Sequence, residues 1–382
     1  MSASNSSQLL YTSLYSSHVQ LGAKMVPFGG WEMPLQYKGI LSEVKAVRED
    51  CGLFDVSHMG RIWFTGKDAT SILEWLLPVR VERLRPGRAR YTVLLDEKAG
   101  IIDDVVVYLL DSAIENNKKY LLVCNASTRL AVLSWINQWS TYFPDVVILD
   151  HTFDTAMIAV QGPSAFQVGD SCLLDSASSL KPFAVIESKI QLDSGPIDVL
   201  ISRTGYTGEN GFEVITPKVN GRDSWDQLRS HGGLPCGLGS RDTLRLEASL
   251  MLSGTDIDIS TSPLEAGLDR FLDLEKEDKK NFVGKDALMD QKRVGLKRKF
   301  VGFVLQERGI PRHGYSIVSD NLEIGTVTSG GYSPTLDMGI GMGYVAVEPS
   351  NRYNQLEIDL RGRRIAINLV ELPFYLRRKD KG

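Results

Sequence analysis

The sequence predicts an α+β protein built on antiparallel sheets, with a small all-β domain at its C-terminal end. Three observations support this prediction. Strand-like runs dominate the chain, and only a few helical patterns interrupt them. The runs do not alternate as strand, helix and parallel strand, so a dinucleotide-binding fold is not expected. Six short strand-like runs within residues 299–372 are spaced as in a small antiparallel barrel or sandwich.

Helical patterns and turn residues locate the elements of the larger N-terminal part. Helical patterns mark four segments, which are residues 40–52, 69–77, 127–143 and 240–252. The third segment begins with Ser and Thr, which suit a helix N-cap. Residues 155–166 are predicted as a strand that leads through Gly-Pro into a helix. Residues 197–216 are predicted as two strands around a glycine-rich loop.

Residues 89–110 have the pattern of a β-hairpin, because Val, Ile, Tyr and Leu flank a turn of Asp, Lys and Gly. Two adjacent acids, Asp103 and Asp104, interrupt its second strand. Successive side chains of a strand point to opposite faces, so the two carboxylates cannot share a face. If both faces are covered, one acid is buried and needs partners or a proton. If the acids lie at the exposed end near the turn, both are solvated.

The length of the hairpin loop decides which acid shares a face with Tyr91. A five-residue loop over residues 96–100 puts Tyr91 on the face of Asp103, and a four-residue loop puts it on the face of Asp104. A slip of one residue exchanges the two faces. Joint use of Tyr91 and Asp104 therefore requires the even-length loop or a β-bulge.

Residues 203–213 form a loop with three glycines, which allow positive φ or the close approach of a ligand. A simple hairpin turn explains the glycines alone. Tyr206 lies between two of them, however, and Glu213 follows on the next strand. A flat ring and a carboxylate suit an aromatic heterocycle with an N–C–N donor edge, because a carboxylate accepts two parallel hydrogen bonds.

Arg241 lies one turn before Leu244 and shares a helix face with Ala248, so we expect it to point at least partly inward. Two interpretations remain open. Arg241 either forms a salt bridge with a neighbouring acid, such as Asp242 or Glu247, or lies beside a ligand carbonyl.

The composition is that of an ordinary globular protein. The chain has 382 residues, of which 43% are hydrophobic and 24% charged, enough for two or three domains. A net charge of −4 gives no case for a nucleic-acid binder. The segment from residue 291 onward contains 15 Lys and Arg but only 9 Asp and Glu, so it carries a net positive charge. This basic part either steers an anionic substrate or acidic partner, or is a solvated face.

Cysteine and histidine spacing predicts no metal site. The four cysteines and five histidines are far apart and form no C-x-x-C pair. Free thiols fit a reducing compartment. The N-terminus lacks the basic start and apolar core of a signal peptide, and no apolar run approaches the roughly 20 residues that span a bilayer. A cytoplasmic location without membrane attachment is expected.

Seven stretches together resemble the T-protein family of the glycine cleavage system, in the order found in that family. They are GAKMVPFGGWEMPLQY, GLFDVSHMG, GIIDDVVVY, AVQGPSA, RTGYTGENGFE, GLGSRDTLRLEASLML and TSGGYSPTL. The resemblance covers about residues 10–375. It implies a three-domain cloverleaf with folate in a central channel. It also implies an aminomethyltransferase that passes the methylene carbon from lipoylated H-protein to tetrahydrofolate. Ammonia and 5,10-methylenetetrahydrofolate are then the products.

The resemblance also implies roles for particular residues. Asp104, the second acid of GIIDD, matches the family's catalytic carboxylate. The positions of Tyr206, Glu213 and Arg241 match those that contact the pterin. The remaining folate-contacting positions are those of Tyr91 and Asn125. Tetrahydrofolate is expected as co-substrate, with no metal, and the partners are H-protein with the P-protein and L-protein of the same system.

Two domains are expected. Residues 1–285 form a folate-binding region of two intertwined subdomains, of which the inner one spans roughly 53–140. Residues 286–382 form a β-barrel.

Two other functions are compatible with the resemblance. One is a folate-dependent demethylase on the same fold. The other is a non-catalytic folate-binding protein, but the K-G-C-Y-x-G-Q-E stretch of that branch is not found.

Overall fold

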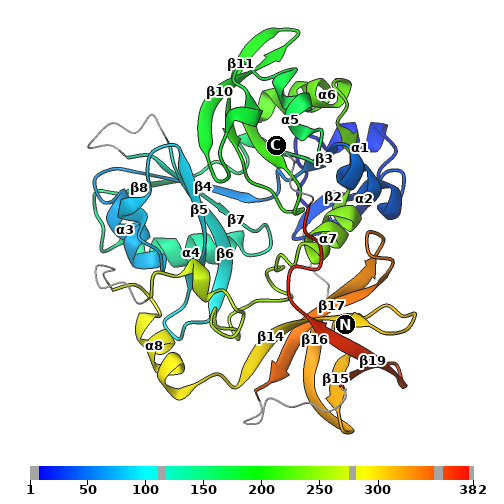
Figure 1. Cartoon of the computed structure of the whole chain (residues 1–382). Helices are drawn as coiled ribbons and strands as arrows, with labels where there is room; N and C mark the ends of the chain where they lie inside the picture. The colour runs from blue at the N-terminus through cyan, green and yellow to red at the C-terminus, as the bar shows by residue number, and fades with distance from the viewer. Residues whose placement is uncertain (1–7, 111–117, 275–280, 348–355, 378–382) are drawn as a thin grey trace, which may run out of the picture.

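The computed structural model describes residues 8–110, 118–274, 281–347 and 356–377. Figure 1 shows three groups of strands around the middle of the molecule, at the left, at the top and at the lower right. They are a five-stranded sheet, a six-stranded sheet and a closed barrel, and a two-stranded hairpin completes the set. The predicted α+β class with antiparallel sheets and a C-terminal barrel is confirmed.

The six-stranded sheet is assembled from distant parts of the chain. Its order is β10 (Val185–Leu192), β11 (Gly195–Ser202), β12 (Gly211–Pro217), β9 (Thr155–Gln161), β3 (Gly52–Asp55) and β13 (Leu234–Pro235). Within the described residues, its β3–β13 pair is the one parallel pair. Its helices are α1 (Tyr15–Gln20), α2 (Ile40–Glu49), α5 (Ala165–Asp170) and α6 (Gly221–Ser230). Trp225 of α6 is fully buried in the core that this sheet shares with α5.

The five-stranded sheet lies between β3 and β9 in sequence. Its order is β5 (Arg88–Leu95), β6 (Ile101–Leu109), β7 (Tyr120–Cys124), β4 (Gly60–Thr65) and β8 (Val147–Asp150). Two amphipathic helices, α3 (Ala69–Leu76) and α4 (Arg129–Ser140), bury apolar residues such as Ile72 and Ile136 against one face. The segments predicted as helices at 69–77 and 127–143 therefore form α3 and α4.

The other face of the five-stranded sheet packs on the six-stranded sheet. Leu121 and Val123 belong to one buried cluster with Met157 and Ala159. Arg61 of β4, which is 0% exposed, links the two sheets. It donates to the Thr155 hydroxyl at 2.7 Å and to backbone carbonyls of both segments. The two sheets therefore form one packed body.

The C-terminal strands close into a barrel with its own core. Its order is β14 (Arg298–Leu305), β17 (Met338–Ala346), β16 (Leu322–Ser333), β15 (Ser316–Ser319), β18 (Leu356–Leu360) and β19 (Arg363–Val370). α8 (Lys285–Val294) precedes it. Inward-facing Val, Ile and Phe residues fill its interior. Of the two predicted architectures, barrel and sandwich, the barrel is the one found.

Helix α7 (Leu238–Glu247) holds the barrel against the rest of the molecule. Arg245 donates to Asp256 at 2.7 Å and to Ser329 of β16 at 2.8 Å. Glu247 accepts from Arg48 of α2 at 2.7 Å and from the Thr335 hydroxyl at 2.9 Å. The helix is shorter than predicted from residues 240–252, because Ser249 has φ 56° and ends the helical path.

The separate two-stranded sheet is an antiparallel hairpin of β1 (Lys24–Phe28) and β2 (Trp31–Gln36).

No helix in the described ranges has both the length and the apolar character to cross a membrane.

Candidate functional site

The β5–β6 hairpin contains a β-bulge that brings Tyr91 and Asp104 to one face. Leu95 pairs with Ile101 across a five-residue loop, but the register then shifts and Val93 pairs with Asp104. The extra residue on β6 exchanges the faces. Tyr91 Oη donates to Asp104 Oδ2 at 3.2 Å. Of the two arrangements that allow joint use of these residues, the structure contains the bulge.

Asn125 lies directly across from Asp104. β6 and β7 pair Val106 with Val123, and the same register continued by two residues puts Asn125 opposite Asp104. The Asn125 Nδ2 group donates to Asp104 Oδ1 at 2.8 Å and to Asp103 Oδ1 at 2.8 Å. Asp103 is 0% exposed, whereas Asp104 is half-buried. The two acids therefore lie on opposite faces, and neither is simply solvated.

Burial and mutual repulsion make Asp104 a weak acid. Loss of solvent and then the charge of Asp103 raise the pKa of Asp104 from 3.8 to about 7, against the hydrogen bonds from Tyr91 and Asn125. Burial also raises the pKa of Asp103. Asp104 can therefore both hold and release a proton close to neutral pH.

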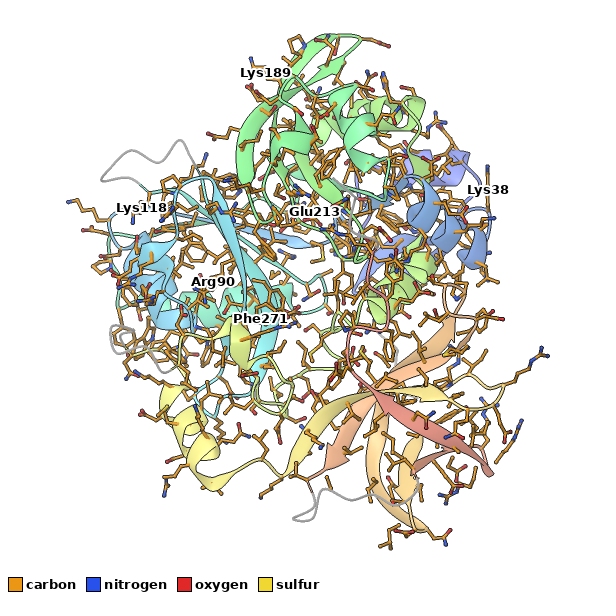
Figure 2. All side chains as sticks on the ribbon, in the orientation of Figure 1. Lys38, Arg90, Lys118, Lys189, Glu213 and Phe271 are labelled. Carbon is orange, nitrogen blue, oxygen red and sulfur yellow. The ribbon has the colours of Figure 1, made fainter. Side chains whose placement is uncertain are left out.

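Glu213 and Arg241 belong to a second cluster. Glu213 of β12 is 9% exposed and accepts from the Thr204 hydroxyl. Burial raises its pKa, while Thr204 and the charge of Arg241 act against the rise. Figure 2 shows Glu213 toward the middle of the molecule. The Arg241 guanidinium carbon lies 4.6 Å from the centre of the Tyr206 ring, a cation–π contact.

The two acids that the sequence suggested as salt-bridge partners of Arg241, Asp242 and Glu247, form salt bridges with other arginines. Asp242 pairs with Arg245 at 2.8 Å, and Glu247 pairs with Arg48 at 2.7 Å. Across the described ranges, Arg241 makes no salt bridge. The salt-bridge interpretation of Arg241 is therefore wrong, and its guanidinium N–H groups are available to a ligand.

Tyr206 joins the two clusters. Its ring lies under Arg241, and its hydroxyl donates to the Met251 carbonyl. Burial raises the pKa of Tyr206, and the charge of Asp104 raises it further. All six predicted residues therefore belong to two adjoining groups, Tyr91, Asp104 and Asn125 in one and Tyr206, Glu213 and Arg241 in the other.

Sequence reasoning missed several neighbours. Phe271 packs edge-to-face on Tyr91, with ring centres 4.7 Å apart, and Figure 2 marks its position. It comes from a 3₁₀ turn (Asp269–Phe271) that no sequence pattern predicts. Thr204, which donates to Glu213, lies in the glycine-rich loop. Its hydroxyl could have been predicted from the sequence as a hydrogen-bond partner for that carboxylate. His58 is buried beside Phe28, and its Nδ1 has no partner in the described structure.

An open groove of about 840 Å³ lies elsewhere, between β4 and the β10–β12 strands. Trp63, Lys119 and Leu200 are among its lining residues, and none of the six predicted site residues lines it. Across the described ranges, no group of three or more His, Cys, Asp or Glu side chains is placed to hold a metal ion.

Comparison with known proteins identifies the family. The GCVT N-terminal domain matches residues 14–276, and the glycine cleavage T-protein C-terminal barrel domain matches residues 298–375. An aminomethyltransferase of Thermosynechococcus vestitus is 41% identical over 372 residues, covering 96% of this chain and 95% of the relative. One from Nostoc sp. is 40% identical over 378 residues, covering 98% and 97%.

A solved structure agrees with the sequence matches. The glycine cleavage system aminomethyltransferase T of Bartonella henselae superposes with a TM-score of 0.88 at 34% identity, covering 97% of this chain and 99% of that chain. The matched domains, the relatives and the superposition all extend over nearly the whole length, and the chain therefore belongs to the glycine cleavage T-protein family.

Proposed function

We propose that this protein is the aminomethyltransferase of a glycine cleavage system. Its donor is the aminomethyl group on the lipoyl arm of H-protein, and its acceptor is tetrahydrofolate. The observation that supports this most directly is Asp104, a half-buried carboxyl with a pKa of about 7 that is held by Tyr91 and Asn125. It lies in a chain whose relatives are named aminomethyltransferases.

The second cluster suits the pterin of the folate. The Glu213 carboxylate can accept two parallel hydrogen bonds from the N–C–N donor edge of the ring. Arg241, which has no salt-bridge partner in the described structure, can donate to a ring carbonyl. The Tyr206 ring contacts Arg241, and the charge of Asp104 raises the pKa of its hydroxyl, which supports placing the two clusters around one ligand. Folate bound in this way carries its reacting nitrogens toward Asp104.

The reaction exchanges two bonds of one carbon for two others. The C–N bond to the amine breaks and ammonia leaves, and the C–S bond breaks and leaves a dihydrolipoyl thiol. Two folate nitrogens each lose one proton and bond to the same carbon, and these two protons balance the one gained by the departing amine and the one gained by the thiol sulfur. An ionised Asp104 accepts a proton from the attacking nitrogen and stabilises positive charge on the carbon, a contribution of roughly 10²–10⁴-fold in rate. Holding both reactants in place can lower the barrier by up to roughly 7–11 kcal/mol.

The direct test mixes the protein with aminomethyl-loaded H-protein and tetrahydrofolate and measures ammonia. We expect ammonia in step with methylenetetrahydrofolate. Release no faster than without the enzyme would overturn the proposal. The demethylase alternative is tested with a methylated amine donor in place of H-protein. The products measured are then the demethylated donor and methyltetrahydrofolate, because loss of a methyl group releases no ammonia.

Asp104→Asn is expected to lower turnover at least about a hundredfold while folate affinity stays within a few-fold, because the amide cannot accept the proton. Steady-state ammonia release and folate titration measure the two quantities. Turnover close to that of the unmodified protein would remove the role assigned to Asp104.

We also propose that acidic H-protein docks on the basic part after residue 291. Several of its cations are already engaged, among them Arg293, which pairs with Asp290 at 3.2 Å, and Arg298, which pairs with Glu265 at 3.3 Å. Lys297 precedes β14 and is a better candidate for intermolecular contact. Within the same proposal, P-protein and L-protein act on the same H-protein, and the location is cytoplasmic, where the buried free cysteines remain reduced.

The domain division at residues 285 and 286 is part of this proposal. The bounds of the two matched family domains, 14–276 and 298–375, lie on either side of it and support it. The inner subdomain expected at roughly 53–140 includes most of the five-stranded sheet, whose strands run from Gly60 to Asp150.

A further inference from the structure

Asp103 is a fully buried carboxyl with no cation beside it. It is 0% exposed, and it forms no salt bridge within the described residues. It accepts from the backbone N–H of Asn125 at 2.8 Å and from the side-chain amide of Asn125 at 2.8 Å, and the hydroxyls of Ser253 and Thr128 also act on it as hydrogen-bond donors that lower its pKa. A buried carboxyl without a cation costs several kcal/mol, and an apolar residue would pack there at lower cost. Both of its 2.8 Å hydrogen bonds come from Asn125, one from the backbone and one from the side chain, which points to a role exerted through that residue.

Asp103 fixes which end of the Asn125 amide faces Asp104. An amide nitrogen has two hydrogens. One is directed at Asp103 Oδ1, and the other at Asp104, where Oδ1 lies at 2.8 Å and the backbone oxygen at 3.2 Å. The flipped amide would turn its oxygen toward both carboxyls and would be repelled by them. Because Asp103 accepts from both the backbone and the side chain of Asn125, the amide is held in the donating orientation.

We propose that Asp103 is a positioning residue for the transfer reaction: it holds the Asn125 amide so that this amide and Tyr91 together orient the Asp104 carboxyl. This inference rests on the proposed function, in which Asp104 is the reacting acid. The hydrogen-bonded order is Asp103, Asn125, Asp104, Tyr91, and it crosses from one face of the sheet to the other.

Asp103 also acts on Asp104 through its charge. After burial, the charge of Asp103 is the largest cause that raises the pKa of Asp104 to about 7. The other titratable or polar groups around Asp104 are Tyr91 from β5, Asn125 after β7 and Tyr206 from the loop before β12. Arg241 and Arg245 lie beyond Tyr206 and influence that phenol. Removing the charge of Asp103 therefore lowers the pKa of Asp104.

The test compares Asp103→Asn with the unmodified protein in the ammonia assay across pH. In the variant, one of the two acceptor oxygens becomes an NH₂ donor, so at least one of the two hydrogen bonds from Asn125 is lost together with the charge. We expect turnover to fall at least about tenfold. We expect the acid limb of its pH profile to move to lower pH by about half a unit or more, because Asp104 ionises more easily. Folate affinity stays within a few-fold.

A matched control comes from the same face of the hairpin. Thr92 is fully buried, faces the same side as Asp103, and its hydroxyl has no partner in the described structure. Thr92→Val changes a buried polar group of the same sheet without touching Asn125. Its turnover and pH profile should match those of the unmodified protein.

A double-mutant cycle separates positioning from general packing. If Asp103 acts through Asn125, then Asp103→Asn lowers turnover less than about twofold further in the Asn125→Ala background. Should Asp103→Asn fail to fold by circular dichroism, Asp103→Ser takes its place. An unmoved acid limb, or an undiminished effect in the Asn125→Ala background, would overturn the inference. These results are distinct from failure of the proposed function, in which the unmodified protein releases no ammonia.

Discussion

The raised pKa of Asp104 makes a quantitative prediction about stability. A carboxyl whose pKa is higher in the folded chain than in the unfolded chain binds its proton more tightly when folded. Its stabilising contribution is therefore complete below pH 4 and is lost as the pH rises through about 7. Asp104→Asn removes this titration, so the variant should gain stability relative to the unmodified protein as the pH rises from 4 to 8.

The structure sets the size of the effect. The interval from 3.8 to about 7 corresponds to about 4 kcal/mol at about 1.4 kcal/mol per pH unit, which is an upper bound. Asp104 is half-buried, so solvent screens part of this energy. The variant also weakens the hydrogen bonds from Tyr91 and Asn125 at every pH. We therefore expect a relative gain of about 1–3 kcal/mol between pH 5 and pH 8.

Thermal unfolding without folate, followed by circular dichroism at several pH values, measures this change. The difference in Tm between Asp104→Asn and the unmodified protein should rise by a few degrees from pH 5 to pH 8. Glu97→Gln is the matched control, because Glu97 is an exposed acid in the loop of the same hairpin. Its Tm difference should not vary with pH.

A Tm difference for Asp104→Asn that stays constant from pH 5 to pH 8 would refute the reasoning. It would mean that Asp104 titrates alike in the folded and unfolded chains. The account of a proton held near neutral pH would then fail, whatever the effect of the variant on turnover.

Three further predictions concern other parts of the molecule. Arg241→Ala should weaken folate binding roughly 10–100-fold in a fluorescence titration, because it removes a charged donor, and unchanged affinity would return Arg241 to a structural role. Burial alone would raise the pKa of Asp55, but its hydrogen bonds from His18, Ser57 and Thr12 lower the pKa to about 2. The stabilising contribution of the ionised Asp55, about 2 kcal/mol, is present above pH 4 and is lost as the pH falls through about 2. The loss of stability caused by Asp55→Asn, measured by urea unfolding, should therefore shrink as the pH is lowered. A loss of stability that stays constant with pH would contradict this. Association with H-protein should slow as salt shortens the Debye length below about 8 Å, and a salt-independent on-rate in stopped flow would argue against docking on the basic part.

Much of the fold was readable from the sequence because it is encoded locally. The apolar period of α3 and α4 and the strand-like runs of the barrel are short-range patterns, and each specifies one element by itself. The ends of elements were less predictable. α7 stops at Glu247 because Ser249 adopts positive φ, a local conformation that the helical period of Leu244, Ala248 and Met251 does not reveal.

The sequence by itself determined the chemical inventory of this protein: the paired acids of one hairpin, the glycine-rich loop with Tyr206 and Glu213, and an inward-facing Arg241. Only the tertiary structure decided how these groups act together. A single bulged residue on β6 determined that Tyr91 faces Asp104, and the β6–β7 register brought Asn125 between the two acids. Bulges and strand register depend on pairing between distant residues and on the packing of both sheet faces, so no local pattern specifies them.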